Sequence, residues 1–571
     1  MMDQVVAAFA GLDQTYVAVF IGFLRWVSPV LALLILLRCG LPLLSFRREP
    51  EIWAWLCTED GKKHAITHWE NVIGRNGLCD VVVDFPTVSR NHAVLTRYDD
   101  GSWTVSDAGS KSGITVNEER GKIFALQEGD VISVGGVDMT FRPITARQEQ
   151  RLAQLRTKAA SLGSSVANLL LLSVFQCLVC MGFLLNGRGG TGVIWGFGGI
   201  MAIQWALLSF YAVIDRPAFG VETIAFFLCT MGMAAIAAVK PNEALKQLLS
   251  LGLGVGLFLA VGWSLRDLER AKKIRYYAMA AGVLFLLVTL ALGKEINGAK
   301  NWLIFGSISI QPSELSKICF VFAGASTMDR LMDKRNLYLF IGYSVLVCGC
   351  LALMNDFGTA LIFFMAFLVI AYLRSGSVGT LGLACTALGF AGVVALRIAP
   401  HALRRFASWR HIWEVPLDGG FQQTRAIMCM ASGGLLGLGP GEGWMRNVFA
   451  ADSDMVFATI SEEWGLVMAV LLVGAVVMLA VFTVRSAVVG RSSFYTIGAC
   501  TAGGILLTQV ILNALGTVDV VPLTGVTFPF VSNGGSSMIG MWGLLAFVKA
   551  ADTRQNGSFA VRLTGGRDSD E

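Results

Sequence analysis

Long runs of nearly uncharged residues constrain this chain more than any other feature. Many windows hold about 18 or more such residues, the length an α-helix needs to cross a membrane. Only 15% of the 571 residues are charged, whereas soluble domains carry about 25%. The apolar runs are continuous and do not alternate with polar residues, which favours helices over a barrel. The sequence therefore predicts a polytopic α-helical membrane protein.

Thirteen membrane spans are predicted from these runs. The helix length that crosses hydrocarbon sets their approximate bounds. They lie near residues 16–44, 165–186, 191–214, 221–239, 246–264, 276–293, 314–329, 337–353, 357–373, 377–396, 455–484, 495–515 and 535–550.

The basic residues predict the orientation of these spans. Basic segments follow the first span at Arg47 and Arg48, and later spans at 266–275, 329–335 and 485–491. Loops rich in Lys and Arg stay in the cytoplasm. We therefore expect an external N-terminus and a cytoplasmic C-terminus. These basic clusters are short and lie at membrane borders, so they do not indicate nucleic-acid binding.

One polar segment, residues 51–143, interrupts the apolar pattern. Short alternating runs such as 92–98 and 102–107 are separated by turn residues, which is typical of a small β-sandwich. The segment lies between the first and second spans and is expected to face the cytoplasm. The predicted organisation is completed by an N-terminal helix in 1–48, a basic helical linker at 144–164, two additional helices in 165–214, a membrane core at 221–550 and a disordered tail at 551–571.

A charged stretch at 297–317 lies between the sixth and seventh spans. It places Lys300, Gln311, Glu314 and Lys317 between and inside strongly apolar segments. A charged side chain at membrane depth costs about 2.5–3.5 kcal/mol, so it usually has a partner or a function. Glu314 and Lys317 are three residues apart and can pair on one helical face. Both a structural ion pair and a functional site fit this spacing.

The sandwich segment carries Gly74-Arg75, Ser89 to His92, and a Gly-bearing loop from Asp107 to Gly113. It resembles the forkhead-associated (FHA) domain over most of its length. The resemblance implies phosphothreonine binding, with His92 as a buried residue that supports the loops. Asn usually stands where this chain has Ser112, so a sandwich without phosphopeptide binding is the alternative. The implied binding residues are Arg75, Ser89, Arg90, Lys111 and Ser112.

Residues 221–550 resemble the SEDS family (shape, elongation, division and sporulation), whose members include FtsW, RodA and SpoVE. Five motifs in order carry the resemblance. Departures include Lys300 where Arg is usual and Arg425 where Gln is common. The motifs are NGAKNWL with QPSELSK (297–317), NDFGTA (355–360), FQQ with ASGGLLGLG (421–439), DMVFA with EEWG (454–465) and PLTG with PFVSNGGSS (522–537).

The resemblance implies an inverting peptidoglycan glycosyltransferase that polymerises lipid II at the outer face of a bacterial cell membrane. It makes Asp454 the candidate general base, and the apolar residues after it favour a raised pKa. A helix N-cap is the alternative for Asp454. Lys300 or Lys317 would receive pyrophosphate and Glu314 would orient one of them.

Other candidate residues have simpler alternatives. Gln311 belongs to the same motif as Glu314, and Ser532 either binds substrate or shapes a Gly-rich turn. Arg404, Arg405 and Arg410 are further phosphate candidates or a solvated basic loop. At least one of the two glutamates inside the eleventh span should face the cavity or a partner. These are Glu462 and Glu463.

The implied chemistry also names cofactors and partners. A leaving pyrophosphate needs cations or a metal ion, Mg²⁺ or Mn²⁺, although the sequence identifies no metal ligands. Expected partners are lipid II, a class B penicillin-binding transpeptidase and a phosphothreonine protein. Two other functions stay open, namely a lipid II flippase and a phosphorylation-dependent scaffold.

Overall fold

The computed structural model describes residues 13–45, 52–552 and 557, other than 78, 99–100, 146–147, 149–160, 188, 267, 297, 307, 328–333, 376–377, 399, 489 and 491. Most of the predicted linker at 144–164 and of the predicted tail at 551–571 lies outside these residues.

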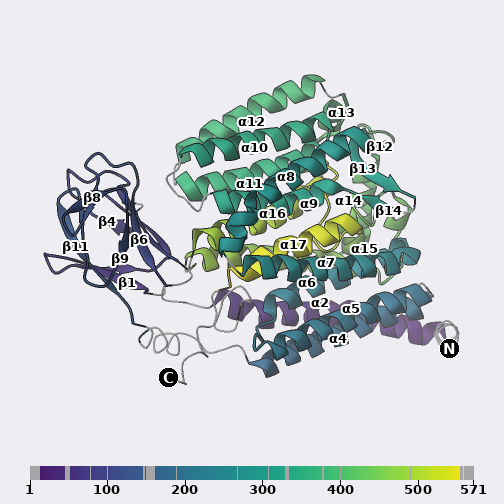
Figure 1. Cartoon of the computed structure of the whole chain (residues 1–571). Coiled ribbons are helices and arrows are strands. Elements are labelled where there is room, and N and C mark those ends of the chain that lie inside the picture. The colour runs from purple at the N-terminus through teal and green to yellow at the C-terminus, as the bar shows by residue number, and fades with distance from the viewer. Residues whose placement is uncertain are drawn as a thin grey trace.

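Each of the thirteen predicted spans coincides with a helix (Figure 1). Within the described residues, nine helices are long and apolar enough to cross a membrane. This confirms the predicted polytopic helical class. The helices are α2 (Gln14–Leu44), α4 (Leu162–Leu185), α5 (Thr191–Val213), α6 (Gly220–Val239), α7 (Ala244–Leu265), α8 (Leu268–Leu292), α9 (Pro312–Thr327), α10 (Lys334–Leu353), α11 (Phe357–Ser375), α12 (Val378–Ile398), α15 (Val456–Val488), α16 (Ser493–Thr517) and α17 (Gly535–Ala550).

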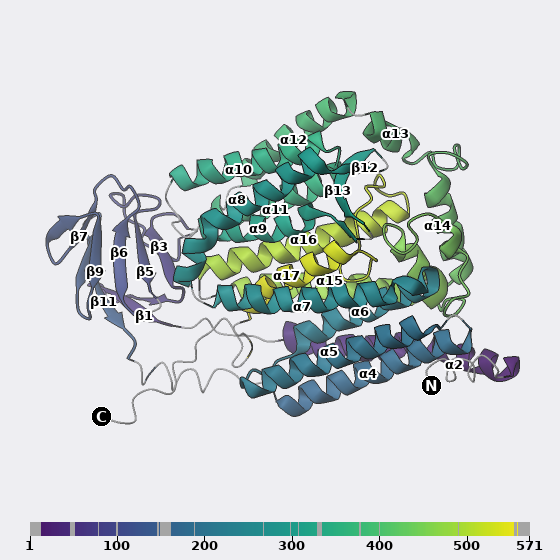
Figure 2. The same ribbon diagram turned by 45° about the vertical axis from the view of Figure 1, so that its right-hand side comes forward.

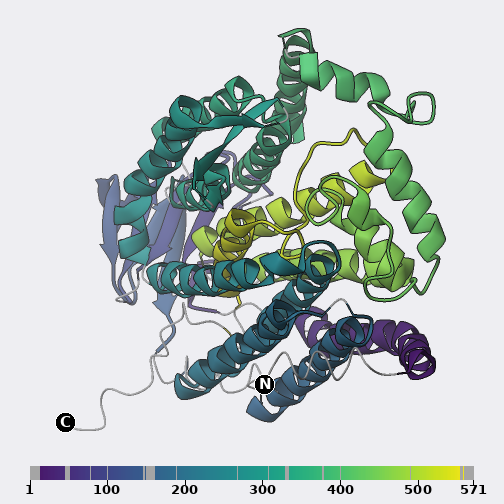
Figure 3. The same cartoon turned by 90° about the vertical axis from the view of Figure 1, so that its right-hand side faces the viewer.

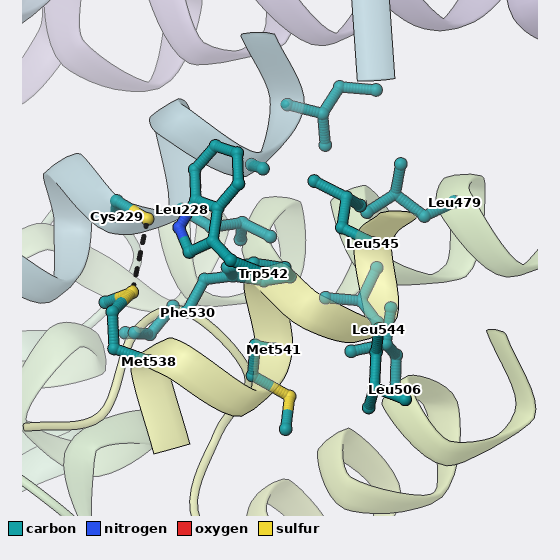
Figure 4. Close-up of a cluster of buried hydrophobic side chains, with 14 of the residues drawn as sticks. Leu228, Cys229, Leu479, Leu506, Phe530, Met538, Met541, Trp542, Leu544 and Leu545 are labelled. Carbon is teal, nitrogen blue, oxygen red and sulfur yellow. Dashed lines mark hydrogen bonds between the residues drawn. The ribbon is translucent and has the colours of Figure 1, made fainter. Parts of the chain in front are cut away.

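The centre of the bundle is built on α6 and α17. The Trp542 ring lies 4.9 Å from Phe226, 5.6 Å from Phe258 and 5.9 Å from Phe530, measured between ring centroids. Figure 4 shows the Cys229 sulfur 3.7 Å from that of Met538 beside this ring. Because such aromatic contacts are strong and directional, they fix α17 and the preceding loop against α6.

Three helices, α2, α4 and α5, pack along one side of this bundle (Figure 2). Their attachment includes a buried amide pair, in which Gln176 and Gln204 donate to each other at 3.0 and 2.9 Å. Gln176 also donates to the Thr230 hydroxyl on α6 at 2.9 Å. Satisfied polar groups inside a membrane bundle hold helices together and fix their register.

The polar segment forms the predicted β-sandwich. One sheet has the strand order β2-β1-β11-β10-β7-β8 and the other β4-β3-β5-β6-β9. Inward-facing residues such as Leu56, Leu95 and Phe141 are fully buried between them. The strands are β1 (Ala54–Thr58), β2 (Lys63–Ile66), β3 (Glu70–Gly74), β4 (Val81–Val82), β5 (Ala93–Arg97), β6 (Trp103–Asp107), β7 (Ile114–Val116), β8 (Glu119–Gly121), β9 (Ile123–Leu126), β10 (Val131–Val134) and β11 (Val137–Pro143).

The sandwich contacts one end of the helical bundle. The Glu70 carboxylate accepts hydrogen bonds from the Ser492 hydroxyl at 3.2 Å, the Ser493 backbone N–H at 3.0 Å and the Ser493 hydroxyl. Trp69 packs against the membrane core beside them. Because these contacts cap the start of α16, they join the two domains directly.

The opposite end of the bundle carries structure that the sequence did not predict. Between the sixth and seventh predicted spans, the chain forms a three-stranded antiparallel sheet. The long connection at 397–453 contains further helices. These elements are β12 (Lys294–Ile296), β13 (Ala299–Phe305), β14 (Ile308–Ile310), α13 (Pro400–Ser408), α14 (Phe421–Gly433) and η2 (Met445–Asn447).

Candidate active site

Asp454 lies just before α15, which begins at Val456. Figure 3 shows the bundle from the end that carries α13 and the sheet β12–β14. Its side chain is half-buried. Asn513 of α16 donates to the Asp454 carbonyl oxygen at 2.9 Å and to that of Val526 at 2.8 Å. This one amide therefore holds the Asp454 segment and the loop before α17 together. Asn513 lies outside the five motifs, so it was not predicted as a site residue. Its position as a polar residue in an apolar span could have identified it.

The surroundings of Asp454 disfavour its charged form. Burial raises the pKa of this carboxyl to about 7, the nearby Arg405 guanidinium lowers it, and Asp452 and Asp356 raise it. Within the described part of the chain, no backbone N–H donates to this carboxylate, so it does not make the N-cap that was the alternative. An unpaired carboxyl that titrates near neutrality can accept a proton from a substrate.

The neighbouring Asp452 is committed to other groups. It is buried, and both its oxygens lie 3.1 Å from the Lys240 ammonium. The Asn533 side chain donates to the Asp452 carboxylate at 2.7 Å, and the Asn533 backbone N–H donates to the Asp452 carbonyl at 2.7 Å. Because Asp452 is paired, it is a poorer candidate base than Asp454.

Asp356 organises the motif residues beside α11. Its carboxylate accepts from the Thr359 N–H at 3.1 Å, which caps the helix. The same carboxylate accepts from Asn301 at 2.9 Å and from Gln311 at 3.4 Å. Gln311 also donates its backbone N–H to the Ser536 hydroxyl at 2.9 Å. The structure thus brings Gln311 into the polar network at this end.

Lys300 and Ser532 make contacts with the backbone. The Lys300 ammonium donates to the Leu290 carbonyl at 2.7 Å, at the end of α8. The buried Ser532 hydroxyl donates to the Ser453 carbonyl at 2.7 Å and accepts from the Phe528 N–H at 2.8 Å. These bonds favour the loop-shaping alternative for Ser532, because its hydroxyl is already occupied.

Glu314 and Lys317 form the ion pair that their spacing predicted. The ammonium lies 2.7 Å from Glu314 Oε1, and the residues are 3% and 1% exposed. The other carboxylate oxygen is buried, and the described residues offer it no hydrogen bond. A buried acceptor without a partner costs about 1–3 kcal/mol, which makes this oxygen a candidate contact for a substrate hydroxyl.

The glutamates of α15 support the loop that precedes it. Glu462 accepts from the Trp444 and Met445 N–H groups at 2.9 and 2.8 Å. Glu463 accepts from the Gly441 N–H at 3.0 Å. Gly465 takes a φ of 87° at a kink in this helix, where a side chain would meet the Leu435 carbonyl. The sequence predicted a partner for at least one of these two glutamates, and that partner is the backbone of the loop at 441–445.

The candidate phosphopeptide residues gather at one end of the sandwich. Ser89 accepts the Lys111 N–H on its hydroxyl at 3.1 Å, and its carbonyl accepts the Arg75 N–H at 3.0 Å. His92 is fully buried, accepting from the Ser89 N–H at 3.0 Å, with its other ring nitrogen 2.9 Å from the Gly113 carbonyl. The side chains that remain exposed are those of Arg75, Arg90, Lys111 and Ser112.

Comparison with known proteins identifies both parts. Residues 227–557, more than half of the chain, match the cell cycle protein family of FtsW, RodA and SpoVE. The chain belongs to this family. Residues 71–135 match the FHA domain, which confirms the second predicted resemblance.

Curated relatives of the membrane part are named as enzymes. Peptidoglycan glycosyltransferase RodA of Mycobacterium tuberculosis H37Rv is 30% identical over 331 residues, which are 54% of this chain and 69% of that protein. The probable peptidoglycan glycosyltransferase FtsW of Coxiella burnetii is 31% identical over 302 residues, 50% and 80% of the two chains. These names confirm the predicted enzyme class, a peptidoglycan glycosyltransferase. A chain of a solved peptidoglycan synthase complex is 26% identical with a TM-score of 0.48, covering 58% of this chain and 96% of that one.

Proposed function

We propose that this family member polymerises lipid II into glycan strands at the outer membrane face, with Asp454 as the general base. The observation that carries the proposal is the half-buried Asp454 carboxyl, which makes no hydrogen bond or ion pair with the described residues and whose pKa is raised to about 7. The acceptor sugar hydroxyl attacks the anomeric carbon of the donor while its proton passes to Asp454. The bond from that carbon to the lipid diphosphate breaks, and the diphosphate leaves with the bonding electrons. Positioned proton transfer of this kind contributes about 10²–10⁴-fold in rate.

The arrangement of the chain supports the assignment of membrane sides. The sheet β12–β14 lies at one end of the bundle and the FHA domain at the other (Figure 1). The Asp454 carboxyl is close enough to Asp356 to feel its charge, and Asp356 accepts a hydrogen bond from Asn301 of β13, which supports placing Asp454 at the end with the sheet. Phosphorylated partners and basic loops belong to the cytoplasm. With the FHA domain there, Asp454 stands at the external face, where a membrane-anchored substrate can reach it.

We propose that the buried ion pair of Glu314 and Lys317 binds the substrate together with neighbouring motif residues. Glu314 Oε2 receives no hydrogen bond from the described residues, so a substrate hydroxyl or a change in the Lys317 contact can satisfy it. Lys300 is proposed to approach the diphosphate from the sheet side. Gln311 is proposed to orient the donor together with Asp356, and Ser532 to keep the adjoining loop in shape.

The carboxylates of Asp452 and Asp356 are poor ligands for a metal ion at this site. Asp452 and Asp356 have their oxygens engaged by protein donors, and the described residues contain no group of three or more His, Cys, Asp or Glu side chains that could hold an ion. Mg²⁺ takes free carboxylate oxygens and water. No step of the proposed reaction is therefore assigned to a divalent cation.

The function is tested with the purified chain in vesicles supplied with lipid II and the candidate transpeptidase partner. We expect long glycan strands on gel electrophoresis. Transfer of lipid II between leaflets without any strand would instead identify a flippase. Strands formed only when a phosphoprotein is added, with no dependence on the membrane site, would identify a scaffold.

Polymerisation should depend on pH near neutrality. A base must be deprotonated to accept a proton, so the rate is low below the pKa of Asp454 and rises as pH passes through about 7. We expect kcat/KM to rise about tenfold per pH unit below that point and to level off above it. The measurement is an initial-rate profile from pH 5.5 to 9. A flat profile across this range would contradict Asp454 as the titrating base.

The FHA domain is proposed to bind a phosphothreonine peptide while docked. Glu70 is the first residue of β3 and Arg75 directly follows its last residue, so the two lie about 16–17 Å apart at about 3.3 Å per residue. The contact with Ser492 and Ser493 therefore leaves the candidate phosphate loops clear of the bundle. A phosphorylated partner can then be held close to the enzyme without undocking the domain.

Replacing Arg75 by alanine should weaken phosphopeptide binding by at least about tenfold. Arg75 is exposed and offers a planar set of donors that matches a phosphate, and a charge-assisted bond contributes about 1.5–3 kcal/mol. The measurement is fluorescence anisotropy of a phosphothreonine peptide library on the full chain in nanodiscs. Arg142→Ala, an exposed arginine on β11, is the matched control. Equal binding of unphosphorylated peptides, or no effect of Arg75→Ala, would contradict the assignment.

A further inference from the structure

A glycine lies beside both charged groups at the candidate active site. Gly525 has a φ of +71°, and a Cβ atom there would lie 3.4 Å from Asp454 Oδ2 and 3.8 Å from Arg405 Nη1. The two charged atoms therefore lie within about 7 Å of each other. Because Gly525 has only a hydrogen atom as its side chain, no Cβ atom stands beside the Asp454 carboxylate and the Arg405 guanidinium.

Arg405 keeps most of its donors available. It is exposed near the end of α13, and the one hydrogen bond that its guanidinium makes in the described structure is a 3.4 Å contact from Nη1 to the Leu523 carbonyl. A guanidinium carries five N–H donors in a planar fork. The remaining donors can therefore take a ligand with paired oxygens.

Three other cations of the candidate site already make contacts within the protein. Lys317 is buried against Glu314 at 2.7 Å. Lys240 pairs with Asp452. The Lys300 ammonium donates to the Leu290 carbonyl, and as a point charge without a planar fork it can only supplement Arg405 at the diphosphate. Among the described residues, Arg405 is also the cation whose charge acts on the Asp454 carboxyl.

We propose that Arg405 binds the diphosphate of the donor substrate, and that Gly525 keeps the space between this guanidinium and Asp454 open for the reacting sugar. The inference rests on the proposed function. As the bond to the anomeric carbon breaks, the negative charge that develops on the diphosphate oxygen is stabilised by the Arg405 fork. The acceptor proton meanwhile moves to Asp454. A planar fork suits a diphosphate better than an ammonium does, because it binds two oxygens at once.

The charges around Asp454 make the pH profile a sharp test. Three charged residues act on the Asp454 carboxyl. Arg405 belongs to α13 and Asp356 precedes α11, while Asp452 lies two residues earlier in the chain and is paired with Lys240. Removing the Arg405 charge withdraws the group that favours the ionised carboxyl. The acidic limb of the rate profile should then move to higher pH by about half a unit to one unit.

The experiment compares Arg405→Gln, Arg405→Lys and the control Arg425→Gln in the lipid II assay. Arg425 lies on the neighbouring α14, with its guanidinium 4.8 Å from the Phe421 ring. We expect Arg405→Gln to lower kcat/KM by about a hundredfold. Arg405→Lys keeps the charge without the fork and should lose about tenfold. Inorganic pyrophosphate should inhibit the wild type at about tenfold lower concentration than it inhibits Arg405→Gln.

A fall in rate together with the shifted limb and weaker pyrophosphate inhibition supports the proposal. Arg405→Gln that polymerises as fast as Arg425→Gln overturns it. A slower variant whose pH limb and pyrophosphate inhibition match the wild type also overturns it, because Arg405 would then only hold α13 in place. If Asp454→Asn is active, the proposed function fails. If Asp454→Asn is inactive and Arg405→Gln is normal, only this inference fails.

Discussion

Replacing Lys317 by methionine should destabilise the membrane core and abolish polymerisation. Glu314 would then be buried with no counter-charge, since the pair is 2.7 Å apart and almost fully shielded. Removing one partner of a buried ion pair costs about 3–5 kcal/mol. The measurement is resistance to thermal and denaturant-induced unfolding in detergent, together with the lipid II assay.

The double variant Glu314→Gln with Lys317→Met separates stability from function. Removing both charges relieves the unpaired carboxylate, so most of the lost stability should return. Activity should stay low, because the proposed substrate contacts need both groups. A double variant that is as unstable as Lys317→Met alone would show that the two residues are not coupled. A stable double variant that polymerises normally would assign the pair to structure alone.

Local sequence patterns were sufficient for the helices, the sandwich and this ion pair. Apolar length identifies a span wherever it occurs, so α2 and α16 are predicted equally well. A spacing of three residues places Glu314 and Lys317 on one face of α9. Motifs of the FHA domain predicted a buried His92, and its two ring contacts agree with that role.

The rest of the site depends on contacts between segments far apart in the chain. Lys240 and Asp452 are 212 residues apart, and Asn513 lies 59 residues from Asp454. No local spacing predicts such pairs. The sheet β12–β14 was missed because its strands are short and turn at Gly298 and Gly306, where φ is positive. The motif that it carries was recognised as a sequence, but not as a sheet.

Replacing Asp454 by asparagine should lower polymerisation by about 10²–10⁴-fold. The amide has nearly the same shape as the carboxyl, and within the described residues the fold takes no hydrogen bond from that group, so stability should change little. Asparagine cannot accept the acceptor's proton at any pH of the assay. The pH-dependent rise near 7 should therefore disappear along with the rate.

The matched control is Asp452→Asn, two residues earlier. Asp452 is held by Lys240 and Asn533, so this change weakens a structural contact without removing the base. We expect it to unfold more easily than Asp454→Asn and to polymerise faster. The reverse order of rates would move the role of base from Asp454 to Asp452.

The central claim is tested most directly by the rate at which wild-type and Asp454→Asn chains convert lipid II to glycan strands. Both are reconstituted in vesicles at equal amounts of folded protein. We predict strands from the wild type and a rate at least about a hundredfold lower from the variant. An Asp454→Asn chain that polymerises at the wild-type rate would contradict the account.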